Sequence, residues 1–384
     1  MSEFDVSVVK CPSYGESEIK KALEAVLTPI GGLDWVEDGM IIAIKANLVT
    51  FAKPEEAVTT HPALICELIK MLRARGAAVI VGDSPGGLYN AAYVNKVYKA
   101  TGMYETEKAG AKLNHNFGQT EVKNPEGVVL KSFVYTSWLD EADAIINFCK
   151  LKTHGMMGMS AAAKNIFGVV PGTLKPEYHF KFPSHSDFAR MIIDLDEFFK
   201  VKLCICDAVV GMEGNGPTMG TPRKIGAVLA SQSPHKMDLV CAKIIGLTKA
   251  DVPTLEAAYE RDLIPAVAEE LNVFGDVDSL VINDYKNIPV HTSVEFKKES
   301  TKFFGKMASV ITEKALRSKP ALKAKECIGC GVCRDICPAK AIKIENGKAL
   351  IDRKLCIRCF CCQEFCPKGA MKVKRTFIAK VLSK

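Results

Sequence analysis

Eight cysteines near the C-terminus are spaced as two copies of one pattern. The segments CIGCGVCRDICP, beginning at Cys327, and CIRCFCCQEFCP, beginning at Cys356, both read C-x2-C-x2-C-x3-C-P. Thiolates three residues apart on a short loop can hold three corners of a 4Fe-4S cubane, while the fourth cysteine, set off by proline, ligates the other cubane. The expected ligand sets are Cys327, Cys330, Cys333 and Cys366 for one cluster, and Cys356, Cys359, Cys362 and Cys337 for the other.

Between the two runs, the segment AIKIENGKALID alternates apolar and polar residues around Asn346-Gly347, which predicts a β-hairpin with a type I′ turn. From Glu326 to Lys374 the sequence resembles bacterial-type ferredoxins with two 4Fe-4S clusters. Zinc is the alternative metal at these cysteines, because sets of four cysteines also bind zinc. A doubled three-cysteine run with crossed fourth ligands favours two cubanes over two tetrahedral ions.

A second group of chemically capable residues lies in KLKTHGMMGMSAAAKNIFGVVPG, which begins at Lys150. Cations that converge in a partly desolvated cleft strengthen the binding of an anion and lower one another's pKa. We expect Lys152, His154 and Lys164 to be catalytic, with His154 as the proton donor. Lys150 is expected to bind the anion and Asn165 to orient a carbonyl group. The alternative is an exposed loop of ordinary surface lysines in which His154 only bonds a backbone carbonyl.

These groups must be positioned by an α/β body that alternates strand-like and helix-like segments. The predicted fold is a mostly parallel sheet with helices on its faces, followed by a small C-terminal α+β ferredoxin-like domain. The expected domains are an α/β domain at 1–296, a basic linker helix at 297–325 and a ferredoxin domain at 326–384. Strands are expected at 6–10, 40–49, 77–82, 142–150, 202–210 and 224–231, and helices at 16–30, 61–76 and 237–247.

Four polar or glycine-rich turns follow predicted strands: IKAN, GDSPGG, KLKTHG and CDAVVGMEGNGPTMGTPRK. In open α/β sheets, ligands bind outside the carboxyl ends of the strands, so parallel strands would bring the four turns to one edge. GDSPGG is expected to cradle an anion with Ser84 and backbone amides, although a plain surface turn explains it equally well. The further residues expected to bind substrate are Lys45, Asn47, Asp83, Ser84, Gly86, Glu213 and Asn215.

Charge is divided unevenly along the chain. Residues 1–296 hold 29 Lys and Arg against 37 Asp and Glu, whereas residues 297–384 hold 22 against 7. The basic C-terminal part is expected to bind an acidic electron donor or acceptor protein of the ferredoxin or flavodoxin type, or the acidic body itself. No nucleic-acid partner is expected. A helix on the membrane surface near 303–316 is the weaker alternative for the linker.

No apolar run approaches the length of a membrane-spanning helix, and the start, MSEFDVSVVK, has no signal-peptide pattern. The expected location is therefore the cytoplasm.

The lysine-histidine segment, GDSPGG and DAVVGMEGNGPTMGTPRKIGAVLAS, in this order before the doubled cysteine run, resemble the domain-of-unknown-function family 362. The resemblance implies an iron-sulfur protein of mostly anaerobic settings and implies no substrate. We expect an oxygen-sensitive iron-sulfur oxidoreductase, a reductase that passes electrons from two 4Fe-4S clusters to a small anionic substrate. A flavin is a further candidate cofactor without a motif. The rival is a non-enzymatic electron-transfer or cluster-carrier protein that docks a redox partner.

Overall fold

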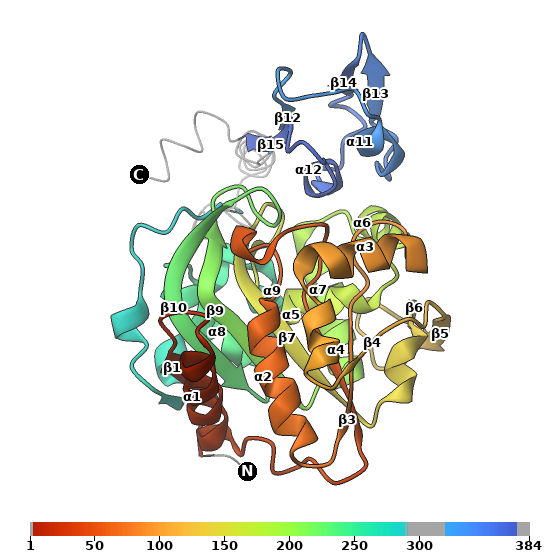
Figure 1. The fold of residues 1–384 in the computed structure, drawn as a ribbon. Helices are drawn as coiled ribbons and strands as arrows, with labels where there is room; N and C mark the ends of the chain where they lie inside the picture. The colour runs from red at the N-terminus through yellow and green to blue at the C-terminus, as the bar shows by residue number, and fades with distance from the viewer. Residues whose placement is uncertain (1–2, 289, 291–318, 375–384) are drawn as a thin grey trace.

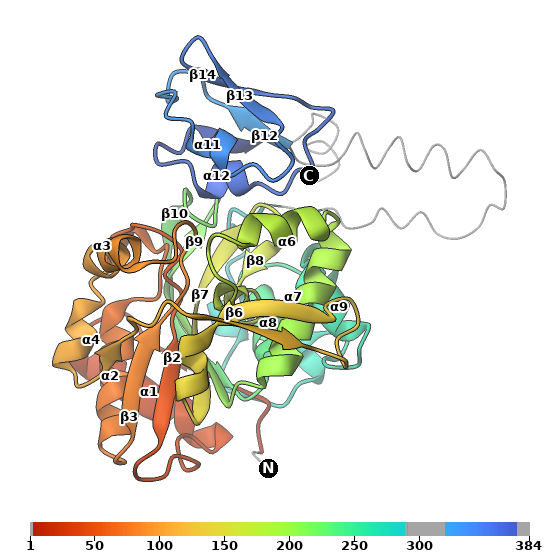
Figure 2. The ribbon, with the colours of Figure 1, turned by 90° about the vertical axis from the view of Figure 1, so that its right-hand side faces the viewer.

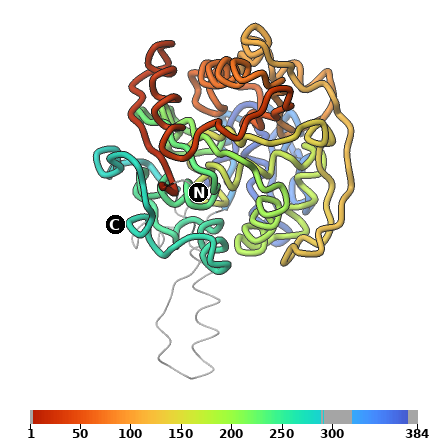
Figure 3. Tube along the Cα trace, turned by 90° about the horizontal axis from the view of Figure 1, so that it is seen from below, coloured from red at the N-terminus to blue at the C-terminus, as the bar shows by residue number. Residues whose placement is uncertain are grey.

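The computed structural model describes residues 3–288, 290 and 319–374. The described residues form a large body, residues 3–288 and 290, and a small C-terminal unit, residues 319–374 (Figures 1 and 2). In both views the C-terminal unit sits on one end of the body. Seen from the opposite end, it lies behind the body (Figure 3).

The body is built on a nine-stranded sheet in which β3, β2, β7 and β9 are neighbours and run parallel. Beyond β9, strands β10 and β1 add antiparallel pairs, and β8 pairs with the end of β7. The strands, in sheet order, are β11 (Val273–Phe274), β1 (Val6–Lys10), β10 (Thr221–Ser231), β9 (Leu203–Glu213), β7 (Ala144–His154), β2 (Ile41–Lys45), β3 (Ala78–Gly82) and β4 (Lys112–Leu113), with β8 (Gly158–Ser160) beside β7. The predicted α/β class with a mostly parallel body sheet is confirmed.

Helices cover both faces of this sheet because its central strands are apolar on both sides. In β7, Ile146 and Phe148 pack toward one face while Cys149 and Leu151 pack toward the other. The first face is covered by α1 (Glu16–Leu27), α2 (Pro62–Arg73), α3 (Ala91–Thr101) and α4 (Tyr104–Lys108). The second is covered by α5 (Ala162–Ile166), α7 (His185–Phe199), α8 (Pro234–Ile244) and α9 (Pro253–Tyr259). A separate hairpin, β5 (Gln119–Lys123) and β6 (Ser132–Thr136), and α6 (Lys175–Lys181) complete the body.

The C-terminal unit consists of two small sheets and two short helices. β12 (Lys319–Leu322) pairs with β15 (Met371–Lys374), and β13 (Ile342–Glu345) pairs with β14 (Lys348–Ile351). Helices α11 (Val332–Asp335) and α12 (Cys361–Glu364) each lie within one cysteine run. Asn346 and Gly347 both have positive φ, 49° and 70°, as the predicted type I′ turn requires.

The predicted linker helix at 297–325 lies mostly outside the described residues, since 291–318 are not described. Its last part, Lys319–Leu322, forms β12 and belongs to the sheet of the C-terminal unit, which therefore reaches further toward the N-terminus than residue 326. Within the described ranges, no helix is both long enough and apolar enough to cross a membrane.

Candidate anion-binding and redox site

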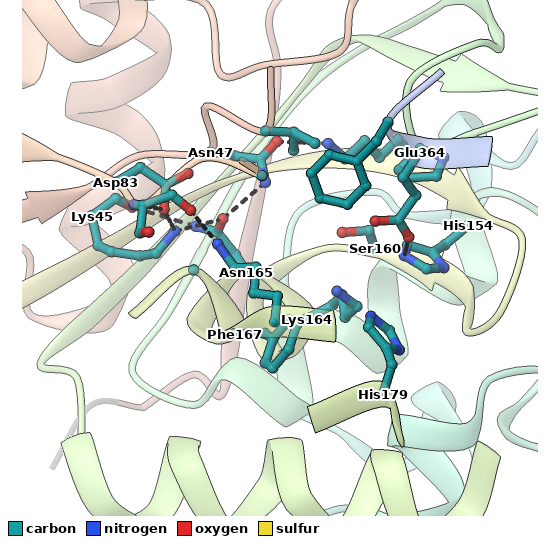
Figure 4. Close-up of a pocket in the computed structure, with 18 residues that line it drawn as sticks. Lys45, Asn47, Asp83, His154, Ser160, Lys164, Asn165, Phe167, His179 and Glu364 are labelled. Atoms are coloured by element: carbon teal, nitrogen blue, oxygen red, sulfur yellow. Dashed lines mark hydrogen bonds and ion pairs between the residues drawn. The ribbon is translucent and has the colours of Figure 1, made fainter. Parts of the chain in front are cut away.

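A pocket lies where the carboxyl ends of β2, β3 and β7 meet the C-terminal unit (Figure 4). All four predicted turns contribute residues to it, the fourth through Pro217, because the parallel strands end at the same edge of the sheet. The pocket contains nine of the twelve residues predicted for substrate binding and catalysis: Lys45, Asn47, Asp83, Ser84, Gly86, Lys152, His154, Lys164 and Asn165.

One part of the pocket is a closed network centred on Asn165. Its Oδ1 accepts from Lys45 Nζ (3.0 Å) and Asn47 Nδ2 (2.9 Å), and its Nδ2 donates to Asn147 Oδ1 (2.7 Å) and to the Lys45 carbonyl (3.3 Å). Lys45 Nζ also pairs with Asp83 Oδ1 at 2.7 Å and bonds the Ala46 carbonyl. Every donor and acceptor of the Asn165 amide is therefore in use. Asn165 holds Lys45 and Asn47 in place. It is therefore not free to orient a substrate carbonyl, which is the role that we predicted from the sequence.

Three other lysines keep donors available to a ligand. Lys152 Nζ donates to Asn47 Oδ1 and to the Val58 carbonyl, both at 2.7 Å, which leaves one N–H. Lys175 Nζ donates to the Ser84 carbonyl, which leaves two N–H groups. Within the described part of the chain, the Lys164 ammonium has ring contacts with Phe167 and Phe188 but no hydrogen bond or ion pair. The N–H groups that these lysines keep available make this side of the pocket suited to an anion.

His154 offers a hydrogen bond rather than a positive charge. Its Nδ1 accepts from the backbone N–H groups of Met156 (3.1 Å) and Met157 (3.2 Å), so the proton of the neutral ring lies on Nε2. Nε2 lies 3.1 Å from Glu364 Oε1. Burial lowers the pKa of His154, although Glu364 opposes this effect. In this arrangement His154 is a neutral donor at Nε2 and is poorly suited to the role of charged acid that we predicted.

The C-terminal unit closes the pocket and rests on the glycine-rich turns. Glu364 and Phe365 line the pocket, and a Cβ placed on Gly86 would overlap the ring of Phe365. Gln363 Nε2 donates to the Asn215 and Gly216 carbonyls at 3.1 and 3.2 Å, and the Val373 amide donates to Asn215 Oδ1 at 3.2 Å. GDSPGG, which we expected to cradle an anion, and the turn between β9 and β10 therefore contact the C-terminal unit.

Besides Asn165 and His154, four residues differ in their observed contacts from their predicted roles. Lys150 does not line the pocket, because its Nζ is bonded to Asp207 Oδ2 and the Tyr14 hydroxyl, both at 2.9 Å. Glu213 pairs with Lys286 at 3.1 Å, and Asn215 binds the C-terminal unit. The amide of Gly86 is bonded to the Val49 carbonyl and cannot cradle an anion.

Sequence reasoning missed several residues of the pocket. Lys175 and His179 lie four residues apart on one face of α6. His179 stacks on Phe188 with ring centroids 4.3 Å apart, and its buried Nδ1 has no hydrogen-bond partner among the described residues. The i, i+4 spacing of a lysine and a histidine was the available signal for this pair. No sequence signal connects Glu364 with the pocket residues of the body, which all lie more than 140 positions earlier.

The eight cysteines of the C-terminal unit surround two cavities in the crossed arrangement. Cys327, Cys330, Cys333 and Cys366 line one cavity, and Cys337, Cys356, Cys359 and Cys362 line the other, together with Cys361. The Ala341 amide donates to Cys337 Sγ at 3.3 Å and the Ala370 amide to Cys366 Sγ at 3.2 Å. Such N–H···S bonds stabilise cluster thiolates. Four thiolates around each cavity fit a cubane.

Burial sets the charge state of the pocket. It lowers the pKa of Lys152 to about 7, with a further contribution from the charge of Lys164, and it lowers the pKa of Lys175 to about 7. The pKa of Lys164 is lowered for the same reason. Burial would raise the pKa of Glu364, but His154 and Lys164 outweigh it and hold this pKa at about 2. A carboxylate thus faces lysines that gain charge as the pH falls through neutrality.

Anion affinity is therefore expected to increase as the pH decreases. A lysine whose pKa is about 7 is charged below that pH and neutral above it, and only the charged form attracts an anion. Because two such lysines line the pocket, affinity should fall by roughly ten- to a hundredfold between pH 6 and pH 8. Calorimetric titration with pyruvate, which stays ionised over this range, measures the effect. Lys152→Met should flatten the profile, and a flat wild-type profile would refute the assignment.

Family models match both the α/β body and the C-terminal unit. The family described as "Domain of unknown function (DUF362)" matches residues 42–243, and the "4Fe-4S dicluster domain" matches residues 319–367. The thylakoid-associated protein sll1697 of Synechocystis is 27% identical over 307 residues, which cover 76% of this chain and 90% of that protein.

Two solved structures show weaker likeness. The lactate racemase apoprotein of Thermoanaerobacterium thermosaccharolyticum has a TM-score of 0.40 at 13% identity, with 64% of this chain and 58% of that chain covered. A Thermotoga maritima protein has a TM-score of 0.35 at 13% identity, with 56% of each chain covered. The match thus spans less than two thirds of either structure. The family match covers more than half of the present sequence. The chain therefore belongs to the DUF362 family and is an iron-sulfur protein with a C-terminal 4Fe-4S dicluster domain.

Proposed function

We propose that this protein is an oxygen-sensitive reductase that acts on a small anionic molecule bound between the body and the C-terminal unit. The supporting observation is that α12, within the second cysteine run, ends in the pocket wall: Glu364 and Phe365 line the same space as Lys164. Cys362 and Glu364 are two residues apart, so their Cα atoms are at most about 7.6 Å apart. Each of the two cysteine sets would hold a 4Fe-4S cluster that supplies single electrons, and the set with Cys362 would hold its cluster next to this wall.

The pocket residues have separate roles in this proposal. Lys164 attracts the anion, and His154 Nε2 donates a hydrogen bond. Lys152 and Lys175 donate protons from Nζ, because a pKa of about 7 suits an acid that acts near neutral pH. Reduction by two electrons then takes up two protons, one from each lysine. Two one-electron clusters match this count, so the proposal does not require a flavin.

The test is anaerobic reoxidation of the fully reduced protein by a panel of small anions. Cluster absorbance follows the oxidation state, and product analysis identifies the reduced compound. We expect at least one anion to reoxidise the protein at a rate that saturates with its concentration. Oxidation that depends only on a partner protein, with no saturable small oxidant, would instead support an electron-transfer or cluster-carrier protein.

We also propose that an acidic electron carrier of the ferredoxin or flavodoxin type docks at the loop that begins at Cys327. Cys330 is exposed, and Ile328 and Val332 are 61% and 37% exposed, whereas Cys359 and Cys362 are buried near the body. Residues 319–374 contain 13 Lys and Arg against 5 Asp and Glu. An exposed apolar loop in a basic surface suits a small, transient interface with an acidic protein.

Reduction by such a carrier should slow as salt increases, because screening weakens the attraction between opposite charges. Lys348, whose Nζ bonds the Cys327 carbonyl, is exposed next to this loop. Lys348→Glu should slow stopped-flow reduction by an acidic ferredoxin but not by dithionite. Lys20→Glu, on α1 of the body, is the matched control. Equal slowing by both variants would argue against this docking surface.

A further inference from the structure

The pocket contains two carboxylates, and only one is bound as a structural group. Asp83 pairs with Lys45 at 2.7 Å and accepts from the backbone amides of Leu48 (2.7 Å) and Ser84 (2.9 Å). Glu364 has no comparable set of partners. Its Oε1 lies 3.1 Å from His154 Nε2, but this atom is buried and makes no well-aligned hydrogen bond to the described residues. A carboxylate oxygen in this state is under-satisfied.

The backbone, and not the carboxylate, holds Glu364 in place. The Thr218 hydroxyl donates to the Glu364 carbonyl at 3.3 Å, and the preceding residue, Gln363, donates to two carbonyls of the 211–220 turn. Phe365 packs against Gly86. The side chain of Glu364 is only 13% exposed and extends from α12 into the pocket beside His154 (Figure 4). Its carboxylate is free to leave without undoing these contacts.

The groups around this carboxylate are those that would bind a ligand. His154 carries its proton on Nε2, 3.1 Å from the Glu364 Oε1 atom, since the backbone amides of Met156 and Met157 both donate to Nδ1. Lys164, with no hydrogen bond or ion pair within the described ranges, lines the same pocket, as does His179 (Figure 4). A side-chain carboxylate therefore lies where an unpaired ammonium and an imidazole N–H converge.

We propose that the Glu364 carboxylate occupies the position of the substrate's own acidic group, and that the substrate is a carboxylic acid whose carboxylate displaces it from His154. This inference rests on the proposed function and narrows its anion to a carboxylate. A planar two-oxygen group fits where a planar two-oxygen group already lies, whereas a tetrahedral phosphate does not reproduce that shape. Glu364 thereby acts as an internal competitor that an incoming substrate must replace.

The test is Glu364→Gln in the full-length, cluster-loaded protein, because glutamine keeps the shape and removes the charge. Calorimetry with pyruvate, and separately with inorganic phosphate, measures binding without electron transfer. We expect pyruvate to bind on the order of tenfold tighter to the variant, because the pocket is no longer occupied by a competing anion. The affinity for phosphate should increase by a smaller factor. Glu345→Gln, on the exposed hairpin of the same unit, is the matched control and should bind as wild type.

Glu364→Ala gives an independent check and should also bind pyruvate more tightly. Unchanged or weaker pyruvate binding in both variants would overturn the inference, and an equal gain for phosphate would overturn the choice of a carboxylate. Failure of the reductase proposal would look different. In that case the variants would still bind pyruvate more tightly, but no carboxylate would reoxidise the reduced protein.

Discussion

Replacing Lys164 by methionine is expected to reduce substrate-dependent reoxidation on the order of a hundredfold, the usual effect of removing one donor that stabilises developing charge. Lys164 forms no hydrogen bond or ion pair with the described residues, so its ammonium is available to a ligand. Methionine retains the unbranched apolar stem against Phe167 and removes the charge. The measurement is the saturating rate of reoxidation by the active anion, followed through cluster absorbance.

Lys181→Met is the matched control for this variant. Lys181 also places its ammonium over a phenylalanine ring, 5.4 Å from the centroid of Phe182, but it lies on the exposed side of α6 outside the pocket. It should react as wild type. Iron content and cluster absorbance should be unchanged in both variants. An active Lys164→Met protein would remove Lys164 from the site.

Replacing Gly86 by alanine is expected to lower the same rate by about tenfold or more while leaving both clusters intact. The added methyl group overlaps the ring of Phe365, so the C-terminal unit must shift away from the pocket. Overpacking of this kind costs about 1–3 kcal/mol, which weakens docking by roughly five- to a hundredfold. Reduction of the clusters by dithionite should not change, because the cysteine cavities lie within the C-terminal unit.

Phe365→Ala combined with Gly86→Ala separates steric overlap from other causes. If the overlap is responsible, the double variant should be no slower than Phe365→Ala alone, because the ring that met the methyl group is gone. Additive losses would show that Gly86→Ala acts in another way. The backbone of Gly86 has no positive φ, so alanine introduces no strain of its own at this position.

The sequence predicted the site where local rules apply. Parallel strands end at one edge, so the turns after β2, β3 and β7 converge, and nine predicted residues line the pocket. The cysteine spacing likewise predicted which cysteines surround each cavity. Lys152 and His154, which we predicted in a turn after residue 150, belong to β7, and the alternation of this longer strand places both in the same pocket.

Alternation alone does not predict the environment of Lys150, which lies on the same face of β7 two residues before Lys152. The period of a strand gives the face of a residue but not where along the strand a pocket begins. In the register of β7 and β9, Lys150 lies opposite Asp207 and pairs with it, and an irregularity in this register follows before Lys152. Whether a lysine binds a ligand or a buried aspartate thus depends on a strand far away in sequence.

Contacts between the two units were beyond sequence reasoning. The glycines of GDSPGG and MEGNGPTMG indicated close approach, but they did not show that the approaching group is Phe365 or Gln363 rather than a ligand. Glu364 lies inside a cysteine run whose pattern concerns only its thiolates. Its place in the pocket results from the contact between the C-terminal unit and the body. No sequence periodicity or residue spacing indicates that contact.

The most direct test of the central claim, that the pocket and the second cysteine cavity are adjacent, is electron paramagnetic resonance of the reduced protein with and without a bound anion. The pocket wall carries Glu364, close to Cys362, whereas Cys330 is exposed on the other cavity. Saturating pyruvate should change the signal of one cluster and leave the other unchanged, and Lys164→Met should abolish the change. Equal responses of both clusters, no response to an anion that calorimetry shows to be bound, or an undiminished response in Lys164→Met would contradict the account.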